Sequence, residues 1–436
     1  QKNERARAAP LQVEIAEGQR ERARAGFLPS VVVGANTTGR PEANQATGSR
    51  LSTAATLTLT QPLLNPSAFP LYDQAKHNVA SARYGSLEDQ RVLAFDTARA
   101  HLQALATERV RDAAVDRLAR ARANLDNAQA RAEAQLNSIN DATRARVDLA
   151  TAMRDAASTT ASLRRAQLQL SLLVGQPVEG TLEAPDALGR AAQDFKGDPA
   201  GMAGPAVDRR PDVLGLRQDI EAARASAREP LYRLIPTLGL AAQLRGDPNT
   251  PPGAKTFDET LSLTLSWTIF DGGARYGDLR TRRAQAETLA LNEQLLRRSV
   301  DTAIRTSLAA LDAAREALTA AEAGAAAAKA NSEETQILYQ QGLARALELT
   351  DANGRRFDAD VALASARLSL TQSFLELRFA LGLWPLEDRP PAEVRGDRGS
   401  EARRAGPSPM TTTTAATRVD PGVTTARAAR PAEVTP

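Results

Sequence analysis

The chain has 436 residues, and its 55 Lys and Arg residues nearly balance its 52 Asp and Glu residues, so the net charge of +3 creates no field that would attract nucleic acid. It contains no cysteine, which excludes thiolate metal sites, disulfides and cysteine nucleophiles. Aromatic residues make up only 4%, and much of the apolar 42% is alanine, a composition that favours long, closely packed helices over a compact enzyme core.

The first part of the chain predicts a helix, two strands, a very long helix and a shorter return helix. Alternation of Leu57 and Leu59 with Thr58 and Thr60 is typical of a strand with one apolar face. The polar loop at 38–50 is rich in Gly, Asn and Thr, as a hairpin connection requires. We predict a helix at about 4–26, strands at 29–37 and 51–64, a long helix at 68–136 and a return helix at 141–174.

After a Gly- and Pro-rich linker at 175–206, the same order of elements is predicted again. The final segment, 387–436, has the Pro, Thr and Arg bias of a disordered tail. For the segment between them, we predict a helix at about 208–233, strands at 236–245 and 260–270, a long helix at 273–341 and a return helix at 346–384.

The long helices are too long to fold back on one small core, because at 1.5 Å per residue each spans on the order of 100 Å. A heptad seam in the second one, formed by Ile304, Leu311, Leu318 and Ala325, predicts close side-by-side packing with another helix. No stretch approaches about 18 consecutive apolar residues, so we expect no transmembrane helix.

The two halves align with each other at a period of about 207 residues, which indicates an internal duplication. The alignment places Pro29 on Pro236 and Asp141 on Glu348. We therefore divide the chain into a first repeat at 1–174, a linker at 175–206, a second repeat at 207–386 and the tail at 387–436. Because Lys2 aligns within the start of the second repeat, we expect a trimmed start, with any signal peptide or lipid-bearing cysteine preceding Gln1.

Four strands with apolar faces need a partner, since free edges are costly and about eight strands are the practical minimum for a closed barrel. Lipid would satisfy the apolar face only if the barrel were closed. Several copies that each donate four strands would meet both needs. We predict an α+β membrane protein whose barrel strands continue into a long α-helical barrel.

Several segments recur in order, twice over. They are "FLPSV" and "LIPTL" before the strands, "LTLTQPLLNP" and "WTIFDGGARYGDL" before the long helices, "INDATRARVDLA", and "YQQGLARALELTDA". Together these segments resemble the TolC- and OprM-like family of outer-membrane efflux and export channels. The resemblance covers roughly residues 2–386. It implies a homotrimer with twelve barrel strands in the outer membrane of a Gram-negative cell and a helical tunnel in the periplasm.

The resemblance also implies partners and a passive role. Such ducts work with a periplasmic adaptor protein and an inner-membrane pump of the RND or ABC type, and they carry drugs, small molecules or proteins. They catalyse no reaction and need no cofactor, and the sequence shows no catalytic constellation of its own. The rival interpretation is a soluble periplasmic coiled-coil scaffold, which explains the heptads but leaves the four strands without a purpose.

Acidic residues are expected at the tunnel tip, near the break between each long helix and its return helix. By resemblance, Glu348 and Asp351 occupy the acidic positions of the constriction, and Asp141 matches the acidic residue of the first turn. Glu348 and Asp351 are three residues apart on one helix face, so three copies would give two carboxylate rings that favour cations. The alternative is an ordinary solvated face of an Arg-rich helix.

Polar links that close the tip are expected around Tyr339, which matches the tyrosine of the family. Ala344 stands where the family has an arginine, so Arg345 or Arg144 is the candidate to replace it. In the first turn, Gln135 stands where the second turn has Gly342.

Four aromatic residues at the junctions of strand and helix fit a belt at the membrane interface, although simple packing of the junction explains them as well. They are Phe69, Tyr72, Trp267 and Phe270. Gly272 and Gly273 give the backbone the freedom to turn from barrel into tunnel. His77 and His101 have no acidic neighbours at ligand spacing, so we expect surface residues and no metal site.

Overall fold

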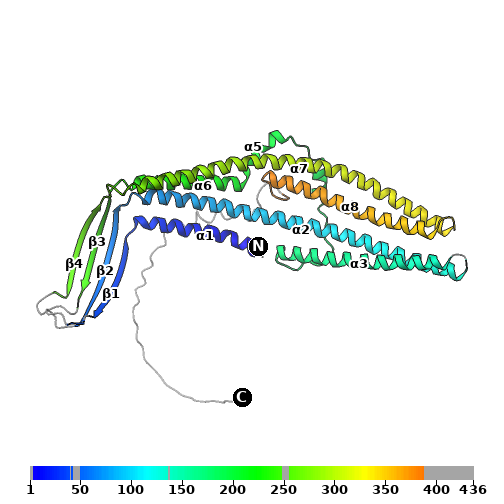
Figure 1. The fold of residues 1–436 in the computed structure, drawn as a ribbon, viewed down its shortest axis with the longest axis horizontal. Helices are drawn as coiled ribbons and strands as arrows, with labels where there is room; N and C mark the ends of the chain where they lie inside the picture. The colour runs from blue at the N-terminus through cyan, green and yellow to red at the C-terminus, as the bar shows by residue number, and fades with distance from the viewer. Residues whose placement is uncertain (1–2, 40, 43–49, 136–137, 248–254, 387–436) are drawn as a thin grey trace, which may run out of the picture. The chain divides into compact units, whose positions relative to one another are not determined.

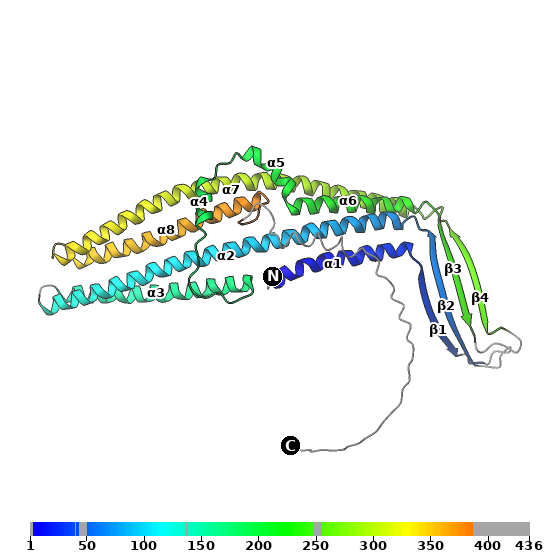
Figure 2. The same ribbon diagram turned by 180° about the vertical axis from the view of Figure 1, so that it is seen from behind.

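The computed structural model describes residues 3–39, 41–42, 50–135, 138–247 and 255–386 (Figures 1 and 2). These residues form mostly α-helix together with one four-stranded sheet, which agrees with the predicted α+β class. The predicted tail at 387–436 and most of the predicted 38–50 loop lie outside the described residues.

The sheet is antiparallel and its strands follow the order β1, β2, β3, β4. Their bounds are β1 Ser30–Gly39, β2 Leu51–Leu64, β3 Thr237–Gly246 and β4 Phe257–Ser266. The register places Leu57 opposite Val33 on one side and Leu244 on the other, so one face is apolar. Within the described chain, β1 and β4 each keep one edge without a partner strand.

The predicted strand at 260–270 is wrong at both ends, since β4 begins at Phe257 and stops at Ser266. Ser266 pairs with Thr237, the first residue of β3, so the residues beyond it have no strand opposite them. Trp267 instead donates a hydrogen bond from Nε1 to the Leu234 carbonyl, at 3.0 Å. Of the other strands, β2 has the predicted bounds, and β1 and β3 differ from theirs by one or two residues.

Two helix pairs follow the strands. The first consists of α2 (Ala68–Glu133) and α3 (Ile139–Val174), and the second of α7 (Ala274–Gln340) and α8 (Ala346–Ala380). In this half of the helical region, α2 contacts both α3 and α8, and α8 contacts α7. Ile304, Leu311, Leu318 and Ala325 are all buried, which confirms the predicted seam of α7.

Nearer the sheet, α1 (Glu4–Arg24) and α6 (Pro211–Tyr232) take the places of the return helices. α1 packs against α2, while α6 lies between α2 and α7. A short 3₁₀ helix, η1 (Ala25–Phe27), joins α1 to β1. In space, the end of α3 meets the start of α1, and the end of α8 meets the start of α6. α1 and α6 then lead into the sheet.

The segment predicted as a plain linker contains two short helices, α4 (Asp186–Asp194) and α5 (Pro199–Arg209). Its Gly and Pro content concealed them, but tertiary contacts override weak propensity here, because Leu188, Ala192 and Ala206 are buried in the main core. Arg315 of α7 donates from Nη2 to the Ala192 carbonyl at 2.7 Å, which fixes the end of α4.

His101 also anchors this segment, because its Nε2 lies 3.0 Å from the Glu183 carbonyl oxygen. His77 likewise bridges two helices, with Nδ1 at 2.9 Å from Oε1 of Gln218 on α6. Both histidines remain partly exposed, as expected of surface residues. The expectation that His77 has no acidic neighbour is wrong, because Oδ1 of Asp73, one turn earlier, lies 3.9 Å from its Nε2. Across the described helices, none combines the length and the apolar character that crossing a bilayer requires.

Candidate functional site

The turns that end α2 and α7 are built alike, and both need a left-handed residue. Gln135 has φ 59° in the first turn and Gly342 has φ 78° in the second, so the two residues aligned in the sequence have the same backbone role. After each turn, a side chain caps the return helix: Ser138 accepts from the Asn140 amide at 3.2 Å, and Glu348 accepts from the Arg345 amide at 3.1 Å.

Tyr339, in the last turn of α7, is the residue around which the tip packs. It is 1% exposed and lies in a small apolar cluster with Ala346 and Leu349 of α8. Its hydroxyl is buried and has no hydrogen-bond partner among the described residues. A buried phenol without a partner costs free energy.

Arg131, in the last turn of α2, is the residue that reaches Tyr339. Its Cζ lies 5.0 Å from the centroid of the tyrosine ring, and its Nη2 donates to the Gln340 carbonyl at 2.6 Å. Burial raises the pKa of the Tyr339 phenol, the charge of Arg131 opposes this, and the charge of Asp141 raises the pKa further. Charged groups from α2 and α3 therefore act on one tyrosine of α7.

The two predicted acidic residues of α8 are exposed and have partners within their own helix. Glu348 forms the cap described above, and Asp351 pairs with Nη2 of Arg355 at 3.0 Å. Neither carboxylate contributes to the buried core, so both can be neutralised without opening a cavity.

The arginines predicted to replace the family's gate residue lie apart from the tyrosine. Arg144 and Arg345 are exposed, and among the described residues the arginine that lies over the Tyr339 ring is Arg131. Sequence reasoning missed Arg131 because it examined only residues within the turns. The usable signal was a basic residue in the last turn of α2, where the ring of an adjacent helix end can meet it.

The joint between sheet and long helix is set by glycines and an aspartate. Gly272 has φ 69° and Gly273 has φ 88°, a left-handed backbone conformation that favours glycine. Asp271 accepts from the Gly273 and Arg275 amides, each at 3.1 Å. The buried Arg275 donates to Asp271 at 2.9 Å and to the Thr268 carbonyl at 2.8 Å, so the chain direction is held on both sides of the glycines.

The four candidate interface aromatics form two separate groups. Phe69 and Tyr72 both contact the ring of Phe27, with centroids 4.9 and 6.2 Å apart, which is junction packing. Trp267 and Phe270 remain 59% and 84% exposed, and in the described chain no ring contact links them to the first group. Phe69 is also 55% exposed, so exposure alone does not separate the two groups, and Phe69, Trp267 and Phe270 all keep the exposure that a membrane-facing role needs.

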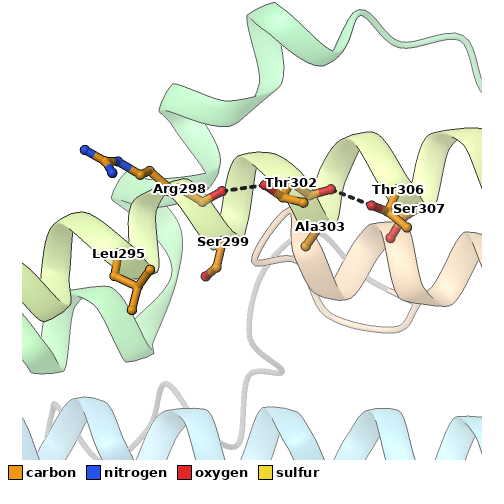
Figure 3. Close-up of a pocket in the computed structure, with 7 residues that line it drawn as sticks. All are labelled: Leu295, Arg298, Ser299, Thr302, Ala303, Thr306 and Ser307. Atoms are coloured by element: carbon orange, nitrogen blue, oxygen red, sulfur yellow. Dashed lines mark hydrogen bonds between the residues drawn. The ribbon is translucent and has the colours of Figure 1, made fainter.

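A shallow hollow of about 580 Å³ lies along α7 and is lined by that helix alone (Figure 3). Its residues are Leu295, Arg298, Ser299, Thr302, Ala303, Thr306 and Ser307. Thr302 and Thr306 donate their hydroxyls to carbonyls one turn earlier, at 3.0 and 2.9 Å. The hollow therefore offers small side chains for helix packing and no reactive group. Among the described residues, no three His, Asp or Glu side chains gather as metal ligands would.

Comparison with known proteins agrees with this architecture. TolC of Escherichia coli (strain K12), an outer membrane protein, is 25% identical over 392 residues, which span 83% of this chain and 76% of TolC. The fold is similar to that of the open Neisseria gonorrhoeae MtrE outer membrane channel, with a TM-score of 0.73, 20% identity, and coverage of 88% of this chain and 87% of MtrE. It is also similar to the Campylobacter jejuni CmeC outer membrane channel, with a TM-score of 0.74, 14% identity, and coverage of 92% and 87%.

The sequence pattern of one family, the outer membrane efflux proteins, matches residues 1–176 and 204–383. The match excludes most of the segment that carries α4 and α5 and includes every strand and long helix. The chain belongs to the outer membrane efflux protein family.

Proposed function

We propose that the protein is one subunit of a homotrimeric, passive exit duct in the outer membrane of a Gram-negative cell, with its helices in the periplasm. The observation that carries this proposal is the sheet, which has one apolar face, two free edges and a direct continuation into helices of 66 and 67 residues. Three copies would supply twelve strands, enough for a closed barrel whose apolar face meets lipid.

The two flanks of the helical layer support contacts between copies. One flank, formed by α1 and α3, exposes Ile15 and Leu172, and the opposite flank, formed by α7, exposes Leu291 and Leu295. Large exposed apolar side chains on both flanks suit a ring in which the α7 flank of one copy packs on the α1–α3 flank of the next.

An internal duplication is supported by the matching lengths of corresponding helices. α2 and α7 have 66 and 67 residues, α3 and α8 have 36 and 35, and α1 and α6 have 21 and 22. Unrelated halves would have no reason to agree in all three pairs.

The duct would work with a periplasmic adaptor and an inner-membrane pump of the RND or ABC type, which supplies the energy. Its cargo would be drugs, small molecules or proteins, and it would catalyse no reaction and bind no nucleic acid. The related Brucella suis protein BepC is named an outer membrane efflux protein, which favours small-molecule efflux as the first cargo to test. A soluble scaffold is the weaker candidate, because it leaves the exposed leucines of β4 uncovered.

At the tip, we assign Glu348 and Asp351 to carboxylate rings, and Asp141, Tyr339 and Arg131 to the contacts that hold the tip closed. Arg131 takes the role first expected of Arg345 or Arg144, since it already bridges α2 and α7. Opening would separate these helix ends and expose the unpaired Tyr339 hydroxyl to water.

Single-channel recording in planar bilayers tests both the duct and the rings. The double variant Glu348→Gln plus Asp351→Asn removes both charges but keeps an oxygen that can cap the Arg345 amide. We expect a conducting, cation-selective wild type, and at least about twofold lower cation selectivity in the variant. Unchanged selectivity would overturn the proposed carboxylate rings but not the duct, whereas recovery of the protein from cells in the soluble fraction rather than the membrane fraction would overturn the duct itself.

A further inference from the structure

The four strands carry three charged residues, all at the end of the sheet remote from the helices. They are Arg245 in β3 and Asp258 and Glu259 in β4. The register pairs Arg245 directly with Asp258, and Arg245 pairs on its other side with Thr56 of β2. Residues that are directly opposite share a face, so these three side chains stand in one row across the sheet.

This row belongs to the polar face. The next row towards the helices is Thr58, Gln243 and Thr260, in which Gln243 donates to the Thr58 hydroxyl at 3.3 Å. Glu259 instead pairs with Leu244 and so lies on the apolar face. The polar face thus carries two charges within its strands, one positive and one negative, side by side.

Both side chains are available to solutes. Arg245 and Asp258 are exposed, and in the described part of the chain neither has an ion-pair partner at 4.0 Å or less. Just beyond the strand ends, Glu42, Arg50, Asp247 and Lys255 add two negative and two positive charges, and the Asp247 amide still donates to the Thr256 carbonyl across the hairpin at 2.9 Å. The rows nearer the helices are uncharged, so this row supplies the charged residues on the polar face of the strands.

We propose that Arg245 and Asp258 form a charge-balanced filter at the outer mouth of the barrel. The inference rests on the proposed trimeric duct, in which the polar face lines the lumen and the remote end faces the exterior. Three copies would place three guanidinium and three carboxylate groups around one ring, with no net charge. Fixed charges act on passing ions within a Debye length of about 8–10 Å, so this balance decides whether the mouth favours either sign of cargo.

The filter differs from the proposed tip rings in what it does. Carboxylates alone at the tip would favour cations, whereas a balanced outer ring would let anions and cations leave equally. Removal of one partner would unbalance the ring, so the two single substitutions should have opposite effects.

The test is the reversal potential of single channels in a potassium chloride gradient for Asp258→Asn, Arg245→Gln and the double variant. We expect Asp258→Asn to shift the permeability ratio towards anions and Arg245→Gln towards cations, each by at least about twofold, and the double variant to resemble the wild type. Glu259→Gln is the matched control, because this neighbour faces the apolar side, and it should leave selectivity unchanged.

Shifts in the same direction, or shifts no larger than that of Glu259→Gln, would overturn the filter while the conductance itself upheld the duct. A wild type without conductance would overturn the duct and the filter with it. Because the chain has no cysteine, Arg245→Cys and Glu259→Cys allow a second measurement with a charged, membrane-impermeant thiol reagent added from outside. Reagent should change the current of Arg245→Cys alone, and an equal effect at both positions would contradict the assigned faces.

Discussion

The two joints at which a return helix meets the helix leading into the sheet are fastened in different ways. At the α3–α1 joint, the Asn3 amide donates from Nδ2 to the Leu172 and Leu173 carbonyls at 3.2 and 2.7 Å. At the α8–α6 joint, two arginines make the equivalent hydrogen bonds. Arg91 donates to the Phe379 carbonyl at 2.9 Å, and Arg210 donates to the Ala380 carbonyl at 3.2 Å.

The arginine joint contains more interactions than the asparagine joint. Arg91 is fully buried, its Cζ lies 4.2 Å from the centroid of the Phe379 ring, and its guanidinium also binds both oxygens of Glu88. Arg210 binds Asp212 in the same manner. Burial alone would raise the pKa of the Asp212 carboxyl, but the hydrogen bonds and charge of Arg210 lower it overall.

The two halves therefore have the same arrangement of helices, but their joints are stabilised to different degrees. A positive charge complements the negative end of a helix, and hydrogen bonds from charged groups stabilise more than neutral ones. Among the described residues, charged hydrogen bonds therefore hold the α8–α6 joint, whereas the α3–α1 joint is held by the neutral side chain of Asn3. Substitutions at the two joints measure this inequality.

The largest effect is expected at Arg91. Arg91→Met keeps much of the side-chain volume but leaves Glu88 and the Phe379 and Leu383 carbonyls without their donor, and should lower the free energy of unfolding by about 3–5 kcal/mol. Guanidinium unfolding followed by circular dichroism measures this change. Arg154→Ala, which breaks an exposed pair with Asp155, is the control and should cost about 0–1 kcal/mol. Equal losses in the two variants would contradict the role of Arg91 in the α8–α6 joint.

A smaller loss is expected at Asn3. Asn3→Ala removes the two bonds across the joint and the cap on α1, where Oδ1 accepts from the Arg5 amide at 2.8 Å, and should cost about 1–2 kcal/mol. Asn3→Ser keeps a capping oxygen but lacks the amide donor, so it separates the joint from the cap. A loss as large as that of Arg91→Met would show that the joints are equally strong.

These fastenings mark the limit of sequence reasoning in this chain. Period-two and heptad patterns predicted the strands and the α7 seam, because each pattern depends on neighbours a few residues apart. Nothing local indicates that Arg91 binds a carbonyl 288 positions away, or that Asn3 reaches one 170 positions away. Arg131 left one local signal, its place in the last turn of α2, but nothing local indicated its partner carbonyl 209 positions away.

Reasoning from the backbone predicted residues where the backbone restricts the choice, whereas the family resemblance was less informative where a side chain can act from several positions. Gly272 and Gly273 were predicted from the need for a turn between strand and helix, and both have positive φ. The gate cation was sought at Arg345 or Arg144, but Arg131 on α2 can reach the same tyrosine from another helix. A positive charge can be supplied from many positions in the sequence, whereas few residue types tolerate a left-handed backbone conformation.

The smallest effect is expected at the opposite ends of the two helix pairs, where the turns differ by one residue. Gln135 adopts φ 59°, which is unfavourable for a residue with a side chain, while Gly342 adopts φ 78° without strain. Gln135→Gly should raise the free energy of unfolding by about 0.5–1 kcal/mol, since relief of strain exceeds the entropy that glycine adds to the unfolded chain. The reciprocal control is Gly342→Ala, whose added methyl group meets no atom within 4 Å, so its loss of stability reports the backbone alone. If Gln135→Gly destabilised the protein, the Gln135 side chain would have to contribute more than the strain costs, and the two turns would not be equivalent after all.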